Sequence, residues 1–157
     1  MDERFVEAAM KNYGDSVLRA AAAVTGNRAD AEDVFSDVFF TLFRRNEYFA
    51  SETHLKAWLL RCAVNNAKNV RNSAHRRLSA ELTDNVAAPK SVDSAYDVPA
   101  AMQALKPEDR IILYLHYYEG YTWVEIAAEL AMPEGTVRSK ALRARERMKA
   151  YFQNIEN

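Results

Sequence analysis

The sequence contains few residues that break helices and almost none that could cross-link the chain. Among its 157 residues are four glycines, four prolines and one cysteine, Cys62. A single cysteine excludes an internal disulfide and is typical of a reducing compartment. No apolar run approaches the roughly 20 residues of a membrane-spanning helix, and the start, Met-Asp-Glu-Arg, lacks the basic-then-apolar order of a signal peptide. We therefore expect a cytoplasmic protein.

Residues that hold metals or perform catalysis are also sparse. The three histidines, His54, His75 and His116, are scattered and have no partner cysteines, so a zinc site is not expected. No nucleophile, metal-binding set or phosphate-binding loop is recognisable. The sequence therefore predicts neither a cofactor nor an enzymatic activity. Its 49% hydrophobic and 27% charged residues instead predict a small folded protein with a hydrophobic core.

Helical periodicity dominates the chain, and no stretch alternates as a strand would. The predicted helices before the C-terminal segment cover residues 4–25, 30–45, 55–77, 100–105 and 107–118. Gly26-Asn27 is a strong stop signal for the first of them, and Gly14 allows a bend within it. Apolar side chains at spacings of three and four predict three buried faces: Val34, Phe35, Val38, Phe39, Leu42 and Phe43; Leu55, Leu59, Cys62, Ala63, Ala67 and Val70; and Ile111, Ile112, Leu115 and Tyr118.

Periodicity is lost between Leu78 and Pro99. This stretch contains two prolines and has four acidic residues against one basic residue, Lys90. Such a composition is typical of a flexible linker. We therefore expect an all-α fold in which a helical domain of residues 1–77 and a second of residues 100–157 are joined by a flexible acidic linker of residues 78–99.

Residues 122–147 have the pattern of a helix-turn-helix. Thr122 and Glu125 have the spacing of a capping box, in which each side chain bonds to the backbone N–H of the other residue. Ala131-Met132-Pro133 interrupts this helix, and a proline is tolerated where the next one begins. Ala131 carries backbone strain if it is left-handed there. The second helix has a predicted buried stripe of Val137, Ala141, Ala144, Met148 and Phe152.

That second helix is strongly basic. Between Ala131 and Lys149 there are six basic and two acidic residues, a local charge of +4 in a chain whose net charge is −1. An amphipathic helix with a solvated charged face can have this pattern. Phosphate attraction is local, however, and a helix-turn-helix sets its second helix in the major groove, so we predict DNA binding. The candidate contacts are Thr136, Arg138, Ser139, Lys140, Arg143, Arg145 and Arg147.

A second basic helix precedes the linker. From Lys56 to Arg77 there are six basic residues and no acidic one, together with four asparagines. Asparagine is a poor helix former, whereas amides and guanidinium groups on one face suit contacts to bases and phosphates. Trp58 at the edge of this face could stack on an unpaired base or pack in the core. The predicted nucleic-acid contacts are Trp58, Arg61, Asn65, Asn66, Lys68, Asn69, Arg71, Arg76 and Arg77.

Acidic residues recur on the second predicted helix at Asp30, Asp33 and Asp37. A carboxylate near the start of a helix is stabilised by the helix dipole, which accounts for Asp30 and Asp33. Asp37 lies two turns into the helix, where stabilisation of a carboxylate by the helix dipole is weaker.

The order of these features resembles the bacterial sigma factors of the extracytoplasmic-function group, and the resemblance spans nearly the whole chain. In the first domain it rests on Asp30-Ala31-Glu32-Asp33-Val34-Phe35 with Asp37, and on Leu55-Lys56-Ala57-Trp58-Leu59-Leu60-Arg61 with Asn65. In the second domain it rests on Ala104-Leu105-Lys106-Pro107, Tyr118-Glu119-Gly120-Tyr121-Thr122, Glu125-Ile126-Ala127, Gly135-Thr136-Val137-Arg138-Ser139 and Arg143-Ala144-Arg145-Glu146.

This resemblance implies a protein that binds core RNA polymerase, directs it to particular promoters and helps to open the duplex. The second domain would read the minus-35 element, with Gly135 and Val137 also among the contacts by position. The first domain would capture the minus-10 element on the face around Asn65, beside a loop at residues 47–54 that holds an extruded base. The polymerase would dock on Asp30, Asp33, Ser36 and Asp37. An inhibitory anti-sigma partner is expected, as is a monomer when the protein is free.

Two other functions fit parts of the sequence. The chain could be a stand-alone helix-turn-helix regulator whose residues 1–77 dimerise or sense a signal, and such a protein would bind duplex DNA tightly without polymerase. It could also sequester another factor through its basic faces. The acid-free helix from Lys56 to Arg77 argues against the stand-alone regulator.

Overall fold

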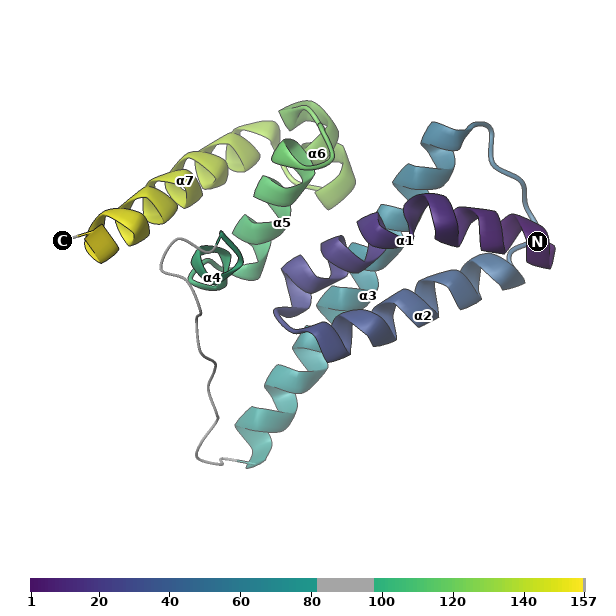
Figure 1. Cartoon of the computed structure of the whole chain (residues 1–157), viewed down its shortest axis with the longest axis horizontal. Coiled ribbons are helices and arrows are strands. Elements are labelled where there is room, and N and C mark those ends of the chain that lie inside the picture. The colour runs from purple at the N-terminus through teal and green to yellow at the C-terminus, as the bar shows by residue number, and fades with distance from the viewer. Residues whose placement is uncertain (82–97, 157) are drawn as a thin grey trace. The chain divides into compact units, whose positions relative to one another are not determined.

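The computed structural model describes the backbone of residues 1–81 and 98–156, and the side chains of residues 1–73 and 101–153. Every regular element in that part of the chain is a helix, as the sequence predicts (Figure 1). The helices group into two compact units, residues 1–72 and 73–157, and each unit has buried apolar residues of its own.

The first unit is built on a pair of helices joined by a short turn. α1 spans Glu3–Thr25 and α2 spans Arg28–Arg44, and the two pack side by side (Figure 1). Gly26 ends α1 in the left-handed conformation, with a φ of 82°, which glycine adopts without steric penalty. The side chain of Asn27 then caps α2. The chain therefore reverses direction between α1 and α2.

Gly14 lies within an uninterrupted α1, so the bend that it allowed is absent. It is buried, and a Cβ built at Gly14 would lie 3.3 Å from the ring of Phe35 on α2. The absence of a side chain at Gly14 therefore allows α1 and α2 to pack closely.

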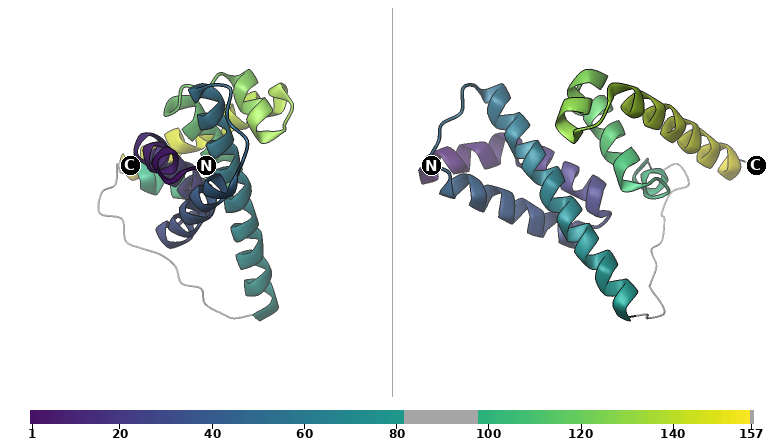
Figure 2. Two further views of the ribbon diagram at one scale, coloured as in Figure 1. Left: turned by 90° about the vertical axis from the view of Figure 1, so that its right-hand side faces the viewer. Right: turned by 180° about the vertical axis from the view of Figure 1, so that it is seen from behind.

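A long helix completes the first unit. α3 spans Glu52–Glu81 and runs across the α1–α2 pair (Figure 2). It continues past the predicted end at Arg77, and six of its side chains are buried: Leu55, Leu59, Leu60, Ala63, Val64 and Ala67. Leu60 and Val64 were not among the predicted core residues. Cys62 and Val70 were predicted, but both are half-buried.

Two aromatic residues predicted to be core lie on the surface. Phe43 is 49% exposed and Tyr118 is 65% exposed. The apolar stripe of α2 is wider than the area that the rest of the unit covers. Phe39 is therefore buried, whereas Phe43 at the edge of the stripe is exposed. Tyr118 follows the last residue of α5, where its ring stacks on that of Tyr114 instead of entering the core. Periodicity alone does not show where a neighbouring helix stops covering a face.

In the described part of the second unit, four helices follow the last residues of α3. α4 spans Val98–Gln103, α5 spans Pro107–Tyr117, α6 spans Trp123–Leu130 and α7 spans Glu134–Glu156. α7 packs against the other three, and α5 also packs against α6. The fully or almost fully buried residues include Ile111, Ile112, Leu115, Ile126, Val137, Ala141 and Ala144. Met148 and Phe152 of the predicted α7 stripe are half-buried.

The turn between α6 and α7 has the geometry that the sequence predicts. Glu125 N–H donates to Thr122 Oγ1 at 3.1 Å, and Thr122 N–H donates to Glu125 Oε1 at 2.8 Å, which is a complete capping box. α6 ends at Ala131, whose φ of 56° and ψ of 48° are left-handed. Met132 N–H then donates to the carbonyl oxygen of Ala127 at 3.0 Å. Ala131 is the one non-glycine residue of the described backbone with a positive φ.

Both ends of the predicted linker of residues 78–99 are helical. Its first residues, to Glu81, continue α3, and its last two, Val98 and Pro99, belong to α4. Residues 82–97 lie outside the described part of the chain, and so does the prediction that they are flexible.

None of the described helices combines the length and the hydropathy that crossing a membrane requires.

Replacing Ala131 by glycine is expected to stabilise the protein, because a left-handed residue with a Cβ costs about 1–2 kcal/mol. The greater entropy of glycine in the unfolded chain offsets part of this gain, so we expect a net increase of about 0.5–1 kcal/mol in the free energy of unfolding. Ala128→Gly, on the exposed side of helical α6, is the matched control and should destabilise by about 1 kcal/mol. Chemical denaturation measures both, and equal destabilisation by the two variants would contradict the strain.

Candidate nucleic-acid interface

α7 presents a narrow polar face to solvent. Gly135, Ser139 and Leu142 recur at spacings of three and four, so they lie along one line of the helix, and all three are exposed. Arg138 and Arg143, which are also exposed, border this line on either side. Thr136 is half-buried at the first turn. The face therefore offers the Ser139 hydroxyl between two guanidinium groups at the N-terminal part of the helix.

Val137 is a correction to the predicted contacts. Its exposure is 0%, and it belongs to the buried stripe with Ala141 and Ala144. A side chain that α5 and α6 cover has no surface left for DNA, so Val137 is a core residue. Its neighbours in the motif, Thr136 and Arg138, remain at least partly accessible.

Most of the predicted basic contacts of α7 have partners within the protein. Arg138 donates from Nε to Glu134 Oε1 at 2.8 Å, one turn earlier on the same helix. The other three partners lie on α5: Lys140 pairs with Glu108, Arg145 with the Tyr117 hydroxyl and Arg147 with Asp109. Arg143 is exposed, and among the described residues it has no ion-pair partner.

Leu142 was missing from the predicted contacts. It is 52% exposed in the middle of the polar face, seven residues after Gly135. An apolar side chain at such a position can contact the methyl group of thymine in the major groove. The signal was available in the sequence, because Leu142 is out of phase with the buried stripe.

The predicted face of α3 is also present. Trp58, Arg61, Asn65 and Asn69 follow one another at spacings of three and four and therefore share a face. Arg61, Asn65 and Asn69 are exposed, as is Arg71, whereas Asn66 and Lys68 are half-buried. Arg76 and Arg77 lie on the helical backbone, and their side chains are outside the described part.

An aromatic cluster lies at the N-terminal end of this face. The ring of Phe49 packs edge-on against Trp58 at 5.4 Å and against His54 at 5.3 Å. The guanidinium of Arg45 lies 4.5 Å from the centre of Phe49 and 5.2 Å from that of Trp58. The half-buried Trp58 therefore has a packing role. In the preceding loop Tyr48, which is 85% exposed, presents its ring to solvent.

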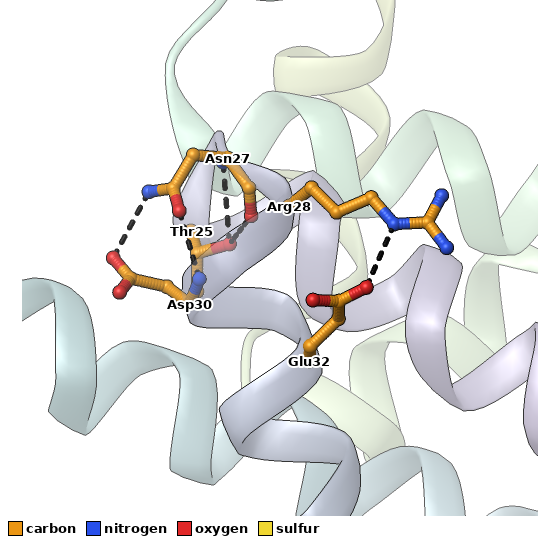
Figure 3. Close-up of polar contacts among 5 residues, drawn as sticks. All are labelled: Thr25, Asn27, Arg28, Asp30 and Glu32. Carbon is orange, nitrogen blue, oxygen red and sulfur yellow. Dashed lines mark hydrogen bonds and ion pairs between the residues drawn. The ribbon is translucent and has the colours of Figure 1, made fainter.

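The acidic residues of α2 divide into a cap, which Figure 3 shows, and an exposed row. Asp30 N–H donates to Asn27 Oδ1 at 2.8 Å, and Asn27 Nδ2 donates to the Asp30 carboxylate at 2.9 Å. Glu32 pairs with Arg28 at 3.0 Å. Asp33, Ser36 and Asp37 are exposed farther along the helix.

This division separates two roles for the carboxylates of α2. The hydrogen bonds of Asp30 stabilise the start of the helix, in agreement with the dipole account. Asp33, Ser36 and Asp37 continue into the exposed Phe40, because their spacings of three and four keep them on one face. Phe40 is 59% exposed and was not among the predicted site residues.

Both units match protein families. Residues 9–77 match the family described as Sigma-70 region 2, and residues 96–148 match the family described as Sigma-70, region 4. The ECF RNA polymerase sigma factor SigE of Mycolicibacterium smegmatis is 33% identical in an alignment of 154 positions, which covers 91% of this chain and 60% of that protein. SigL of Mycobacterium tuberculosis is 30% identical over 78% of this chain and 74% of its own. The ECF sigma-E factor of Escherichia coli is 30% identical over 74% and 71%.

Solved structures share the fold. The sigma factor RpoE of Bartonella quintana, in complex with the anti-sigma factor NepR, aligns with a TM-score of 0.76 and 20% identity over 94% of this chain and 96% of its own. CnrH, in complex with the cytosolic domain of CnrY, aligns with a TM-score of 0.66 and 20% identity over 98% and 90%. At these identities the likeness shows the fold alone.

The first turn of α3 is tied to α1 by a hydrogen bond with a predictable pH dependence. The Tyr13 hydroxyl donates to Glu52 Oε2 at 2.8 Å. This hydrogen bond, together with burial and the negative charge of Glu52, raises the pKa of Tyr13 above its ordinary value of 10.0. A group whose pKa is raised on folding stabilises the protein below its unfolded pKa, and this contribution is lost as the pH rises through the folded pKa.

We expect Tyr13→Phe to lower the free energy of unfolding by an amount that is constant below about pH 10 and shrinks above it. Urea unfolding at a series of pH values measures the difference from the unmodified protein. Tyr48→Phe, at an 85% exposed position, is the control and should give no such dependence. A deficit in Tyr13→Phe that stays constant up to strongly alkaline pH would show that the Glu52 contact does not control this tyrosine.

Proposed function

The chain belongs to the extracytoplasmic-function sigma factors of the sigma-70 family, and we propose that it binds core RNA polymerase, directs it to particular promoters and assists strand opening. The observation that carries this proposal is the exposed face of α7, where Arg143 and Ser139 stand on the second helix of a capped helix-turn-helix. The match of both units to sigma-70 regions supports it.

The second domain, residues 100–157, reads the duplex of the minus-35 element. A helix-turn-helix places the N-terminal residues of its second helix at base edges, which corresponds to Gly135, Thr136, Arg138, Ser139 and Arg143 here. Arginine can donate to both O6 and N7 of guanine, whereas a hydroxyl group can contact either a donor or an acceptor on a base edge. All of these residues except the half-buried Thr136 are exposed, which supports this assignment.

The first domain, residues 1–77, acts on separated strands of the minus-10 element. Exposed amides at Asn65 and Asn69 suit the edges of unpaired bases, and Arg61 and Arg71 suit phosphates. Removing a base from the stack costs a few kcal/mol, so an extruded base needs a receiving surface. The loop ending at Ser51, with its exposed Tyr48, is adjacent in sequence to the start of this face.

Core polymerase docks on the exposed row of α2, formed by Asp33, Ser36 and Asp37. The partner surface is therefore basic, and Phe40 supplies apolar area beside the carboxylates. An anti-sigma factor is a further partner, as it is for the structurally similar RpoE, which was solved in complex with the anti-sigma factor NepR. The protein acts in the cytoplasm as a monomer when free, and it is an initiation factor without catalytic chemistry of its own.

One experiment tests the proposal as a whole. Purified core polymerase is incubated with this protein and genomic DNA, and transcript 5′ ends are mapped with and without it. Start sites that appear only with the protein and share two upstream elements support the proposal. Tight duplex binding by a stable dimer without polymerase, and no new start sites, would instead indicate the stand-alone regulator.

Asp37→Arg is expected to weaken binding to core polymerase by at least tenfold, because it places a positive charge against a basic partner surface. The matched control is Asp15→Arg, the same charge change at an exposed position of α1. Affinities are measured by competition for core enzyme, and helicity by circular dichroism. Equal affinities of the two variants would remove the α2 row from the docking surface.

Duplex reading and strand opening are expected to separate in mutants. Arg143→Ala should cost about 1–3 kcal/mol in recognition of the upstream element, and less on a promoter that lacks it. Asn65→Ala should leave initial duplex binding nearly intact and impair opening. Footprinting of the polymerase complex reports binding, and permanganate reports unpaired thymines. A melting defect alone in Arg143→Ala, or a binding defect alone in Asn65→Ala, would reverse the proposed division of labour.

A further inference from the structure

Two basic side chains of α7, Lys140 and Arg147, form ion pairs with acidic residues of α5, although their charge suggests contact with DNA phosphates. We propose that Lys140 and Arg147 are positioning residues, which attach α7 to the acidic first turn of α5 and so set the helix for DNA without contacting it. The inference rests on the proposed reading of the minus-35 element by α7. It assigns the DNA-facing charge of this helix chiefly to Arg143, with Arg138 held beside it by Glu134.

The first attachment joins Lys140 to Glu108. Lys140 Nζ lies 2.8 Å from Glu108 Oε1, and the lysine side chain is only 28% exposed. A lysine normally keeps its ammonium group in water and covers apolar surface with its stem. Here most of the side chain is covered and its ammonium group is matched to a carboxylate, so contact with a phosphate would require the pair to break.

The second attachment joins Arg147 to Asp109. Arg147 Nη1 lies 3.4 Å from Asp109 Oδ2, and the side chain of Asp109 is only 7% exposed. A buried carboxylate without a counter-charge is strongly unfavourable. Arg147 is the ion-pair partner of Asp109 among the described residues, so its transfer to a phosphate would leave that charge buried and unpaired.

The two attachments act together because of their spacing. Lys140 and Arg147 are seven residues apart, so they lie on the same side of α7 about two turns apart. Glu108 and Asp109 are adjacent in the first turn of α5, where the helix dipole also favours negative charge. The buried stripe of Val137, Ala141 and Ala144 already holds α7 in the unit, and two ion pairs on one edge restrict rotation about that stripe more than one pair would. The angle at which Ser139 and Arg143 meet a groove depends on this restriction.

The proposal changes the expected electrostatics of DNA binding. Each phosphate neutralised by a protein cation contributes about −0.9 to the slope of log K against log salt concentration. If Lys140 contacts a phosphate, its removal should reduce this slope as much as removal of Arg143. If Lys140 is a positioning residue, its removal should lower affinity and leave the slope unchanged.

The test uses the full chain in complex with core polymerase on a promoter identified by start-site mapping. Affinity is measured over a salt series for Lys140→Gln, Glu108→Gln, Arg143→Gln and the charge-swapped double variant Glu108→Lys with Lys140→Glu. Each is compared on the intact promoter and on one with a scrambled upstream element, at a temperature where circular dichroism shows every variant folded. An unfolding cycle on the same variants measures the coupling between positions 108 and 140.

We expect Lys140→Gln and Glu108→Gln each to lose about two- to fivefold in affinity for the intact promoter, as the loss of a partly exposed ion pair predicts. The salt slope should not change in either variant, and the charge swap should recover affinity. Arg143→Gln should reduce the slope by about 0.9. Glu108→Gln is decisive, because removing a negative charge near DNA would raise affinity if Lys140 were released to a phosphate.

Higher affinity in Glu108→Gln, a reduced slope in Lys140→Gln or no coupling in the unfolding cycle would overturn the positioning role. Failure of the proposed function looks different. In that case Arg143→Gln would bind intact and scrambled promoters as the unmodified protein does, and the unfolding cycle would still decide whether the two ion-paired positions are coupled.

Discussion

The second unit depends on the burial of a helix that is too short to form alone. Isolated helices below about 12–15 residues are marginal in water, and α6 has 8 residues. It persists because Ile126 and Leu130 are buried, at 0% and 6% exposure, in a unit where α5 and α7 pack on it. The capping box satisfies its first backbone N–H groups, and the left-handed Ala131 directs the chain into α7. The direction of α7 therefore depends on a few buried side chains and one strained residue, besides the proposed attachment to α5.

The arginines of α7 fall into two classes, which differ in their surroundings. On α7 the exposed guanidinium of Arg143 stands without an ion-pair partner among the described residues, whereas Arg147 compensates the almost buried Asp109. A salt bridge in solvent contributes little to stability, but a buried carboxylate requires its counter-charge. A local charge of +4 thus overstates the charge that α7 can offer to phosphates.

In the first unit, α2 and α3 each bury one face and expose another. α3 buries Leu59 and Ala63 and turns Asn65 and Arg61 outward, while α2 buries Val34 and exposes Asp33 and Asp37. Polar side chains on the exposed faces are thereby accessible to binding partners. A sigma factor needs two such surfaces, since it must hold polymerase and nucleic acid together. Packing on α1 makes this possible, because each helix buries one side and presents the other.

Local signals in the sequence determined the helices, the capping box at Thr122 and Glu125, the stop at Gly26 and the two basic helices. Each of these depends on residues within a few positions of one another, so periodicity and capping rules are sufficient to read them. The family followed from the order of the same motifs. Only the tertiary structure decided that Phe43 and Tyr118 are exposed and that Lys140 and Arg147 pair with α5. These outcomes depend on which distant helix covers a given face, and the one-dimensional pattern of a helix carries no information about its neighbour.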